Sequence, residues 1–372
     1  MTRIFFSAGE SSGDVHGSNL IRALRALEPE VACEGVGGRQ MAKAGMELRH
    51  DLASQAVMGF GEVVRSFRSI RRVFLDTAAH VARSRPDALV VIDYPGFNIR
   101  LAKRAKAAGV PVVYYIGPQV WAWKKGRIHA IAHAVDKMLV ILPFEEALYR
   151  QVGVDCTYVG HPLLDHVART ELTGEFEGEP VIAVLPGSRK QEIARLMDAM
   201  MDVAKGIRQA HPGARFVVPC VDTVRERQVR EAAGDVPLET IVARTYDVLA
   251  AARFALVASG TATLETALFG VPMLILYKTS PLNYAIARWL VHITRIGLVN
   301  ILAGRDVVPE FIQGDACADK VLPVALELIR DTPRRARMLT DLAEVRAGLG
   351  APGASARAAQ AIVDVAKGAA HA

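Results

Sequence analysis

The stretch Val181-Ile-Ala-Val-Leu-Pro-Gly-Ser-Arg189 decides how this sequence folds. Five consecutive apolar residues run into a Pro-Gly turn, and a helical pattern follows directly at 190–209. Strands that are apolar on consecutive residues are typical of parallel sheets covered by helices on both faces. The opening stretch Ile4-Phe-Phe-Ser-Ala-Gly9 has the same design and precedes a helical pattern at 18–27. The chain therefore contains the same strand–loop–helix start twice.

Short β-rich runs alternate with helical patterns along the whole chain, which favours parallel α/β structure. The predicted strands are 3–7, 31–36, 88–93, 110–116, 137–142 and 156–159 in the first half, and 181–185, 215–219, 238–243, 254–258 and 272–277 in the second. The acidic, Gly-containing segment 171–180 has no periodicity and separates the halves. We therefore predict an α/β fold of two doubly wound Rossmann-like domains facing a central cleft, with ligands at the carboxyl ends of the strands. The predicted domains are residues 1–170 and 171–347, followed by a tail helix within 348–372.

Composition limits the classes of protein to which this chain can belong. The 372 residues are 51% hydrophobic and 23% charged, which is ordinary for a globular protein and excludes long disorder. The N-terminus shows no secretory signal, and no run of about 18 apolar residues occurs, so a soluble protein is expected. The cysteines are far apart and fit neither a zinc site nor a disulfide framework, as expected for thiols in a reducing cytoplasm: Cys33, Cys156, Cys220 and Cys317.

The formal net charge is +6, which leaves nucleic acid, phosphates or an anionic membrane surface open as partners. Residues 1–165 carry 21 basic and 16 acidic side chains, whereas the remainder carries 24 and 23. Nearly all of the basic excess therefore lies in the first half.

Two loops of the first half place carboxylates after predicted strands. Ser7-Ala-Gly-Glu-Ser-Ser-Gly-Asp14 follows the first strand, and its glycines permit a tight turn. It lacks the dinucleotide-binding spacing, and Glu10 is suited to hydrogen-bonding sugar hydroxyls. Asp93 ends the apolar run 88–92, at the edge where α/β enzymes place catalytic groups, and is a candidate general base. The alternative for the first loop is a plain strand–helix turn, and the alternative for Asp93 is a helix cap.

The second half has two loops suited to a diphosphate. Ser188 and Arg189 combine backbone amides with an always-charged donor, and Ser259, Gly260 and Thr261 open a helix after a strand. Glu265, one turn into that helix, is suited to a ribose diol. No Walker lysine is present, so a nucleotide diphosphate is favoured over ATP hydrolysis. Two ordinary helix starts are the alternative.

The segment 56–75 has an amphipathic and basic pattern. On a helix the arginines oppose an apolar stripe, and such a helix docks soluble proteins on anionic lipid. A surface helix packed on the sheet, with a solvated basic face, is the alternative. The predicted membrane-contact residues are Val57, Met58, Phe60, Val63, Arg65, Phe67, Arg68, Ile70, Arg71, Arg72 and Phe74.

Taken together, these motifs resemble the lipid-A-disaccharide synthase family. The resemblance runs in order from about residue 3 to 315 and rests on Ala8-Gly-Glu-Ser-Ser-Gly-Asp14, Ala56-Val-Met-Gly59, Val120-Trp-Ala-Trp-Lys124, Leu142-Pro-Phe-Glu145, Gly160-His161, Leu185-Pro-Gly-Ser-Arg189, Ala258-Ser-Gly-Thr261 with Glu265, and Asn300-Ile-Leu-Ala-Gly-Arg305.

The resemblance implies a GT-B glycosyltransferase, peripheral on the cytoplasmic face of the inner membrane. The implied reaction moves 2,3-diacylglucosamine from its UDP conjugate onto the 6-hydroxyl of 2,3-diacylglucosamine 1-phosphate. It inverts the anomeric carbon and gives UDP and a β-1,6 disaccharide, the lipid A precursor. The two lipids and the membrane are the expected partners, with no nucleic acid, cofactor or metal, and the oligomeric state stays open.

Site roles follow from the resemblance, residue by residue. Asp93 resembles the general base and Glu10 an active-site acid, while Arg189, Glu265 and Asn300 match the UDP side. Arg305 and first-half arginines are expected to hold the acceptor phosphate. One position departs from the family: Gly96 stands where an aspartate is common. The alternatives are a UDP-N-acetylglucosamine 2-epimerase-like enzyme, which handles no lipid, and a non-catalytic nucleotide-sugar-binding protein.

Overall fold

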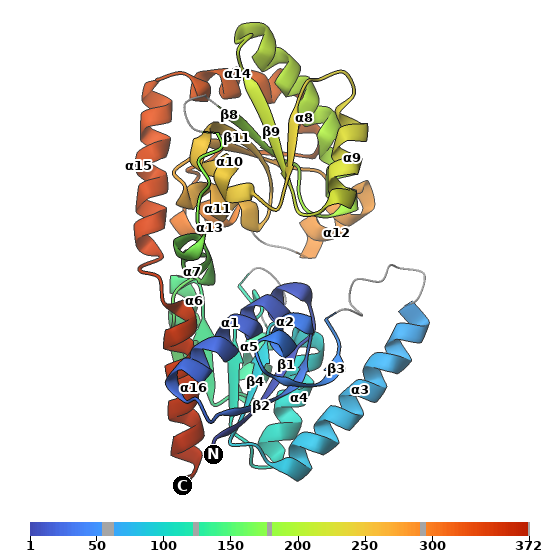
Figure 1. Ribbon diagram of the computed structural model, residues 1–372, viewed down its shortest axis with the longest axis vertical. Coiled ribbons are helices and arrows are strands. Elements are labelled where there is room, and N and C mark those ends of the chain that lie inside the picture. The colour runs from blue at the N-terminus through green and yellow to red at the C-terminus, as the bar shows by residue number, and fades with distance from the viewer. Residues whose placement is uncertain (54–62, 122–125, 177–180, 291–294, 371–372) are drawn as a thin grey trace. The chain divides into compact units, whose positions relative to one another are not determined.

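The computed structural model describes residues 1–53, 63–121, 126–176, 181–290 and 295–370 (Figure 1). These residues belong to two compact units. Unit 1 comprises Met1–Asp165 together with Ala351–Ala372, and unit 2 comprises His166–Gly350. Each unit has its own parallel sheet.

Unit 1 is built on a seven-stranded sheet in the order β3-β2-β1-β4-β5-β6-β7, and all its neighbouring strands are parallel. The strands are β1 Arg3–Ala8, β2 Ala32–Gly37, β3 Glu47–Asp51, β4 Ala88–Ile92, β5 Val112–Tyr115, β6 Lys137–Val140 and β7 Cys156–Tyr158. The helices are α1 Ser11–Leu27, α2 Arg39–Lys43, α3 Val63–Ser84, α4 Pro95–Ala107, α5 Arg127–Ala132, α6 Pro143–Arg150 and α16 Ala354–Ala370, and α7 Pro162–Arg169 crosses into unit 2.

Both faces of this sheet are buried, because side chains of a strand alternate between faces. Phe5 of β1 lies in one core cluster with residues of α3 and α4, while Ile4 and Phe6 lie in the other with residues of α1 and α16. The five residues of β4 are all buried, so this central strand is covered on both sides. Consecutive apolar residues therefore mark the middle of the sheet.

Unit 2 has a six-stranded parallel sheet in the order β10-β9-β8-β11-β12-β13. The strands are β8 Val181–Leu185, β9 Arg215–Cys220, β10 Glu239–Val242, β11 Ala252–Ala258, β12 Met273–Tyr277 and β13 Glu310–Ile312. The helices are α8 Lys190–Ala210, α9 Thr223–Ala233, α10 Thr245–Ala251, α11 Thr261–Leu268, α12 Pro281–Leu290, α13 Leu298–Ala303, α14 Ala318–Ile329 and α15 Pro333–Gly348, with a 3₁₀ turn at Gln313–Asp315.

The predicted fold class, two doubly wound Rossmann-like α/β domains, is confirmed. Every strand predicted from the sequence is present, but the two edge strands β3 and β13 were not predicted. β3 reads Glu-Leu-Arg-His-Asp and lies at the rim, where no continuous apolar run is needed, and β13 has three residues. Among the described residues no helix is long and apolar enough to cross a membrane.

The last helix, α16, packs on unit 1, a placement that the sequence left open (Figure 1). Asp165 accepts hydrogen bonds from three successive backbone amides at the start of α16: Gly353, Ala354 and Ser355. Burial alone raises the pKa of Asp165, but these amides outweigh it and hold the pKa below its usual value. Because the first amides of a helix have no partner within the helix, a carboxylate here fixes where the helix begins.

We predict that Asp165→Ala lowers the free energy of unfolding by about 1–3 kcal/mol, because three buried amides lose their acceptor. Urea denaturation measures this loss, and limited proteolysis near residues 348–353 reports release of α16. Asp364→Ala, which removes an exposed carboxylate of the same helix, is the matched control and should stay within about 0.5 kcal/mol. Equal stability of the two variants would contradict the anchoring role of Asp165.

Candidate active site

The order of the strands reverses once in the sheet of unit 1, between β1 and β4. In doubly wound sheets the carboxyl ends of two such strands flank the ligand crevice. Glu10 follows β1 and Asp93 follows β4, so the structure brings these two predicted residues to the same edge of the sheet. Glu10 is exposed and Asp93 is partly exposed, as catalytic carboxylates require.

Asp93 lies on a strained turn. Its φ is 45° and that of Tyr94 is 47°, both in the left-handed region that non-glycine residues rarely adopt. The turn is held by Asn98, whose side-chain amide donates to the backbone oxygens of Ile92 and Asp93 at 3.0 and 2.8 Å. The Tyr114 hydroxyl donates to the same Asp93 oxygen at 2.8 Å. These bonds fix the backbone from which the Asp93 side chain projects.

The Glu10–Asp93 pair has a characteristic charge environment. Burial, and secondarily the negative charge of Glu10, raise the pKa of Asp93 to about 6. The same two causes raise the pKa of Tyr94. A Cβ at Gly9 would overlap the Tyr94 ring, so glycine is needed for the first loop to approach this close. A carboxylate with a pKa of about 6 is well matched to general base catalysis near neutral pH.

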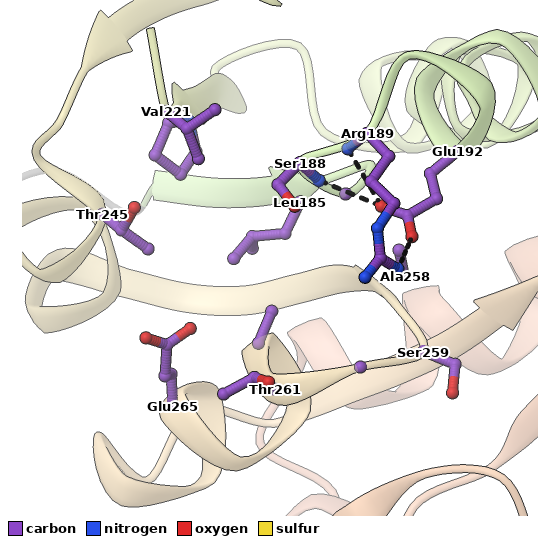
Figure 2. Close-up of a pocket in the computed structure, with 14 residues that line it drawn as sticks. Leu185, Ser188, Arg189, Glu192, Val221, Thr245, Ala258, Ser259, Thr261 and Glu265 are labelled. Atoms are coloured by element: carbon purple, nitrogen blue, oxygen red, sulfur yellow. Dashed lines mark hydrogen bonds and ion pairs between the residues drawn. The ribbon is translucent and has the colours of Figure 1, made fainter. Parts of the chain in front are cut away.

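In unit 2 the strand order reverses between β8 and β11, and a pocket of about 270 Å³ lies at the carboxyl ends of these strands. Figure 2 shows Ser188 and Arg189 on one side of it and Thr261 and Glu265 on the other. The lining includes six of the predicted UDP-side residues: Ser188, Arg189, Ser259, Gly260, Thr261 and Glu265. Gly260 precedes α11, whose N-terminus has no side-chain cap and therefore presents backbone amides to an anion.

Glu192 lies in this pocket and was not predicted. Its carboxylate accepts from the backbone amides of Ser188 and Arg189, both at 3.1 Å, and pairs with the Arg189 guanidinium at 3.0 Å (Figure 2). The loop after β8 is therefore satisfied by the protein's own carboxylate, so any external anion at Arg189 would have to replace Glu192. The signal for it was the acidic residue in the first turn of α8, a capping-box position.

Glu265 is partly exposed in the pocket and accepts a hydrogen bond from the Tyr246 hydroxyl at 3.0 Å. Burial raises the pKa of Glu265 and outweighs this hydrogen bond, which lowers it. Tyr246 in turn packs against Phe269 with ring centroids 5.2 Å apart. The carboxylate is thus held in one orientation, as bidentate recognition of a diol requires.

Three predicted residues have internal partners. The Ser259 hydroxyl donates to the Ile296 backbone oxygen. Asn300 is fully buried and outside the pocket lining; its amide donates to Val308 and Glu310, and its oxygen accepts from backbone amides of the 307–308 loop. Arg305 forms ion pairs with two carboxylates of α15, Asp341 and Glu344. The charge of Arg305 is therefore already compensated within unit 2.

The basic segment is described in part. Val57, Met58 and Phe60 lie outside the described residues, as do the side chains of Val63, Arg65 and Phe67. Arg68, Arg71 and Arg72 are exposed on α3. Ile70 and Phe74 are partly buried and pack against the core of unit 1. In this part of α3 the apolar side lies on the domain and the arginines face solvent.

Glu145 is a further buried acid; it ends the motif Leu142-Pro-Phe-Glu145, but no role in the site was predicted for it from the sequence. Burial raises its pKa to about 7, and it accepts from the Trp121 indole at 3.1 Å and the Leu142 amide at 3.2 Å. Its place in the first turn of α6, after Leu142-Pro143, is the signal that marks it. Within the described part of the chain, no group of three or more His, Cys, Asp or Glu side chains is placed to hold a metal ion.

Comparison with known proteins decides the family. A family model described as "Lipid-A-disaccharide synthetase" matches residues 4–364. The chain belongs to the lipid-A-disaccharide synthase family. It is 44% identical over 366 residues to the lipid-A-disaccharide synthase of Syntrophus aciditrophicus, covering 96% of each chain. It is 39% identical over 373 residues to that of Myxococcus xanthus, covering 98% of this chain and 97% of the relative.

Members of the lipid-A-disaccharide synthase family are glycosyltransferases, and this chain is one. Solved structures with the same fold include a Staphylococcus aureus protein described as "S. aureus MnaA-UDP co-structure" (TM-score 0.65, 15% identity, 95% and 94% coverage). The calicheamicin glycosyltransferase CalG4 aligns with a TM-score of 0.61 at 15% identity, covering 100% of this chain and 99% of that one. At this identity the likeness shows the fold alone, and the fold is that of GT-B enzymes.

We predict that Glu10→Gln shifts the acidic limb of the pH profile of kcat/KM to lower pH. The limb lies near pH 6 in the unaltered protein if it reports Asp93. Removing the neighbouring negative charge makes ionisation of Asp93 easier and lowers its pKa, so activity persists further into acid. The exposed residue change Glu30→Gln is the control and should leave the limb in place. A limb that stays or moves to higher pH would refute the coupling.

Proposed function

We propose that this glycosyltransferase moves 2,3-diacylglucosamine from UDP-2,3-diacylglucosamine to the 6-hydroxyl of 2,3-diacylglucosamine 1-phosphate, with inversion. The observation that carries the proposal is the position of Asp93 after β4, beside Glu10, at the strand-order reversal of a chain that belongs to the lipid-A-disaccharide synthase family. A base of this kind is what inverting glycosyl transfer requires.

In the proposed mechanism Asp93 takes the proton of the acceptor 6-hydroxyl. The oxygen then forms a bond to the anomeric carbon of the donor sugar, and the bond from that carbon to the UDP oxygen breaks. UDP leaves with the electron pair, and the proton stays on Asp93 until it is released to solvent. The raised pKa of Asp93, about 6, makes it a stronger base than an ordinary aspartate while leaving it ionised at neutral pH.

The pocket of unit 2 supports the donor half of the proposal. Amides at the N-terminus of α11 and the guanidinium of Arg189 are donors that stabilise the negative charge developing on a leaving diphosphate. Glu265, fixed by Tyr246, is suited to the ribose hydroxyls. Arg189 reaches the phosphates when its guanidinium leaves Glu192 for the ligand, and Glu192 then keeps its hydrogen bonds from the backbone amides of Ser188 and Arg189.

We predict that Asp93→Asn lowers kcat by about 10²–10⁴-fold, the usual effect of removing a general base, while UDP affinity is unchanged. Asparagine tolerates the left-handed backbone of this position, so the fold is kept. The assay follows disaccharide and UDP formation from the two purified lipids, and UDP affinity is measured by calorimetry.

The matched control is Asp87→Asn, the same change at the opposite end of β4, which should retain full turnover. Near-normal turnover of Asp93→Asn would refute the assignment of Asp93 as the general base. If the unaltered protein bound UDP but formed no disaccharide, the substrate assignment would be refuted and the epimerase-like alternative would be favoured.

We also propose that the protein works on the cytoplasmic face of the inner membrane, docked through the exposed arginines of α3. Each basic residue near an anionic surface contributes about 1 kcal/mol, so Arg68→Ser with Arg72→Ser should weaken sedimentation with anionic vesicles by roughly tenfold or more. Arg227→Ser with Arg346→Ser removes the same charge from unit 2 and is the control. If both double variants bound the vesicles equally well, the arginines of α3 would have no docking role, and α3 would be a surface helix with a solvated basic face.

A further inference from the structure

A groove of about 510 Å³ lies between α3 and α4, beside the catalytic turn. Its volume falls within the range of roughly 300–1,000 Å³ typical of small-molecule sites. The lining is Ile70, Arg71, Phe74, Leu75, Tyr94, Gly96, Phe97 and Arg100. Ile70, Arg71 and Phe74 were considered above only as membrane-contact residues, and no ligand has been assigned to the groove itself, although Tyr94 directly follows Asp93.

The groove is lined mainly by apolar side chains that lead toward Asp93. The Phe74 ring meets the Phe97 ring edge-on with centroids 5.3 Å apart, and Phe97 packs on Tyr94 at 5.9 Å. Tyr94 in turn lies against Gly9 of the first loop. A row of aromatic rings therefore connects the surface of α3 with the Glu10–Asp93 pair, and Leu75, 46% exposed, extends the apolar lining outward.

Two arginines stand in this apolar lining, Arg71 on α3 and Arg100 on α4. Both are exposed, and within the described part of the chain neither guanidinium forms an ion pair with a carboxylate. Arg305, expected from the sequence to hold the acceptor phosphate, is instead paired with Asp341 and Glu344. Arg71 and Arg100 are therefore better placed to bind an anion, since no internal partner has to be displaced.

We propose that this groove binds the acceptor lipid: one acyl chain lies along the aromatic row, and the 1-phosphate is held by Arg71 and Arg100. This inference rests on the proposed function and names the site of its acceptor. In that acceptor the phosphate and the 2-linked acyl chain leave adjacent carbons of the sugar ring. A groove that combines apolar walls with two guanidinium groups that pair with no described carboxylate is complementary to that neighbouring pair of groups.

The charge of the groove favours the acceptor over the donor. The donor also carries acyl chains, but its phosphates are those of UDP, for which unit 2 has its own pocket. A free phosphate group beside an acyl chain belongs to the acceptor alone. The 6-hydroxyl that reacts is carried on the carbon attached to C5, on the other side of the ring oxygen from the phosphate-bearing C1, and Asp93 is adjacent in sequence to the groove residue Tyr94.

Gly96 gives a way to close the groove without disturbing the core. A Cβ at this position meets no atom within 4 Å, and Gly96 lies in the first turn of α4. Gly96→Leu therefore places a side chain in open space and improves helix propensity. We expect this variant to fold and to occupy the room that the acyl chain needs.

The test uses the full chain and dodecyl phosphate, kept below its aggregation concentration, in calorimetric titrations. We expect saturable binding that weakens about tenfold or more in Gly96→Leu and in Arg71→Ser with Arg100→Ser. The control Lys103→Ser with Arg104→Ser removes the same charge from the exposed side of α4 and should bind as the unaltered protein does. Inorganic phosphate binding as tightly as dodecyl phosphate would overturn the acyl-chain part of the proposal.

Kinetics separate the groove from the reaction itself. In the disaccharide assay we expect both groove variants to raise the KM for the acceptor about tenfold or more, with the KM for the donor nearly unchanged. An unchanged acceptor KM, or an equal rise for the donor, would overturn the assignment while disaccharide formation still supported the proposed function. If no disaccharide forms at all, the proposed reaction fails, and the titrations with dodecyl phosphate still decide whether the groove binds a phosphorylated chain.

Discussion

The single reversal of strand order in each sheet is the constraint on which the rest of this protein depends. Because β1 and β4 are neighbours whose following helices cover opposite faces of the sheet, the loops after them are left uncovered by helices. In unit 2 the strand order reverses in the same way between β8 and β11. Glu10 and Asp93 occupy the first reversal, and the pocket with Arg189 and Glu265 lies at the second. One topological rule, used twice, therefore places two carboxylates at one uncovered edge and a pocket with an arginine at the other.

A buried polar network supports the reactive edge of unit 1. Two successive left-handed residues, Asp93 and Tyr94, are unfavourable by about 1–3 kcal/mol each, and such a turn persists only where its surroundings determine it. Asn98 holds the turn: its side-chain amide donates to the backbone oxygens of Ser7, Ile92 and Asp93, and its oxygen accepts from the Ser7 hydroxyl, with all but the Asp93 bond fully buried. The amide therefore offsets the strain and at the same time joins β1 to β4. The geometry of the Asp93 turn and the stability of the central strands both depend on one side chain.

Much of this was predictable because apolar runs and loop residues are local properties. The central strands, both reversal loops, and the lining residues Ser188 and Thr261 follow from patterns of a few neighbouring positions. Asn300 and Arg305 were placed by motif alone, and only the fold shows that one is saturated by the 307–308 loop and the other by α15. Glu192 was overlooked because its effect depends on the loop turning back over the start of α8. Residue type and spacing predict which side chains reach the carboxyl edge of the sheet. They do not predict which of those side chains already have a partner within the protein.

The same distinction changes how the basic excess should be interpreted. A formal charge of +6 counts every arginine equally, yet an arginine whose charge is met by two carboxylates attracts an external anion weakly. The arginines of α3 and α4 that line the groove lack such partners among the described residues and stand beside aromatic walls. Nucleic acid offers phosphates but no long apolar chain, whereas a phosphorylated acyl sugar offers both. Uncompensated charge next to uncovered apolar surface, rather than net charge, is therefore the observation that supports an anionic lipid as the proposed partner of unit 1.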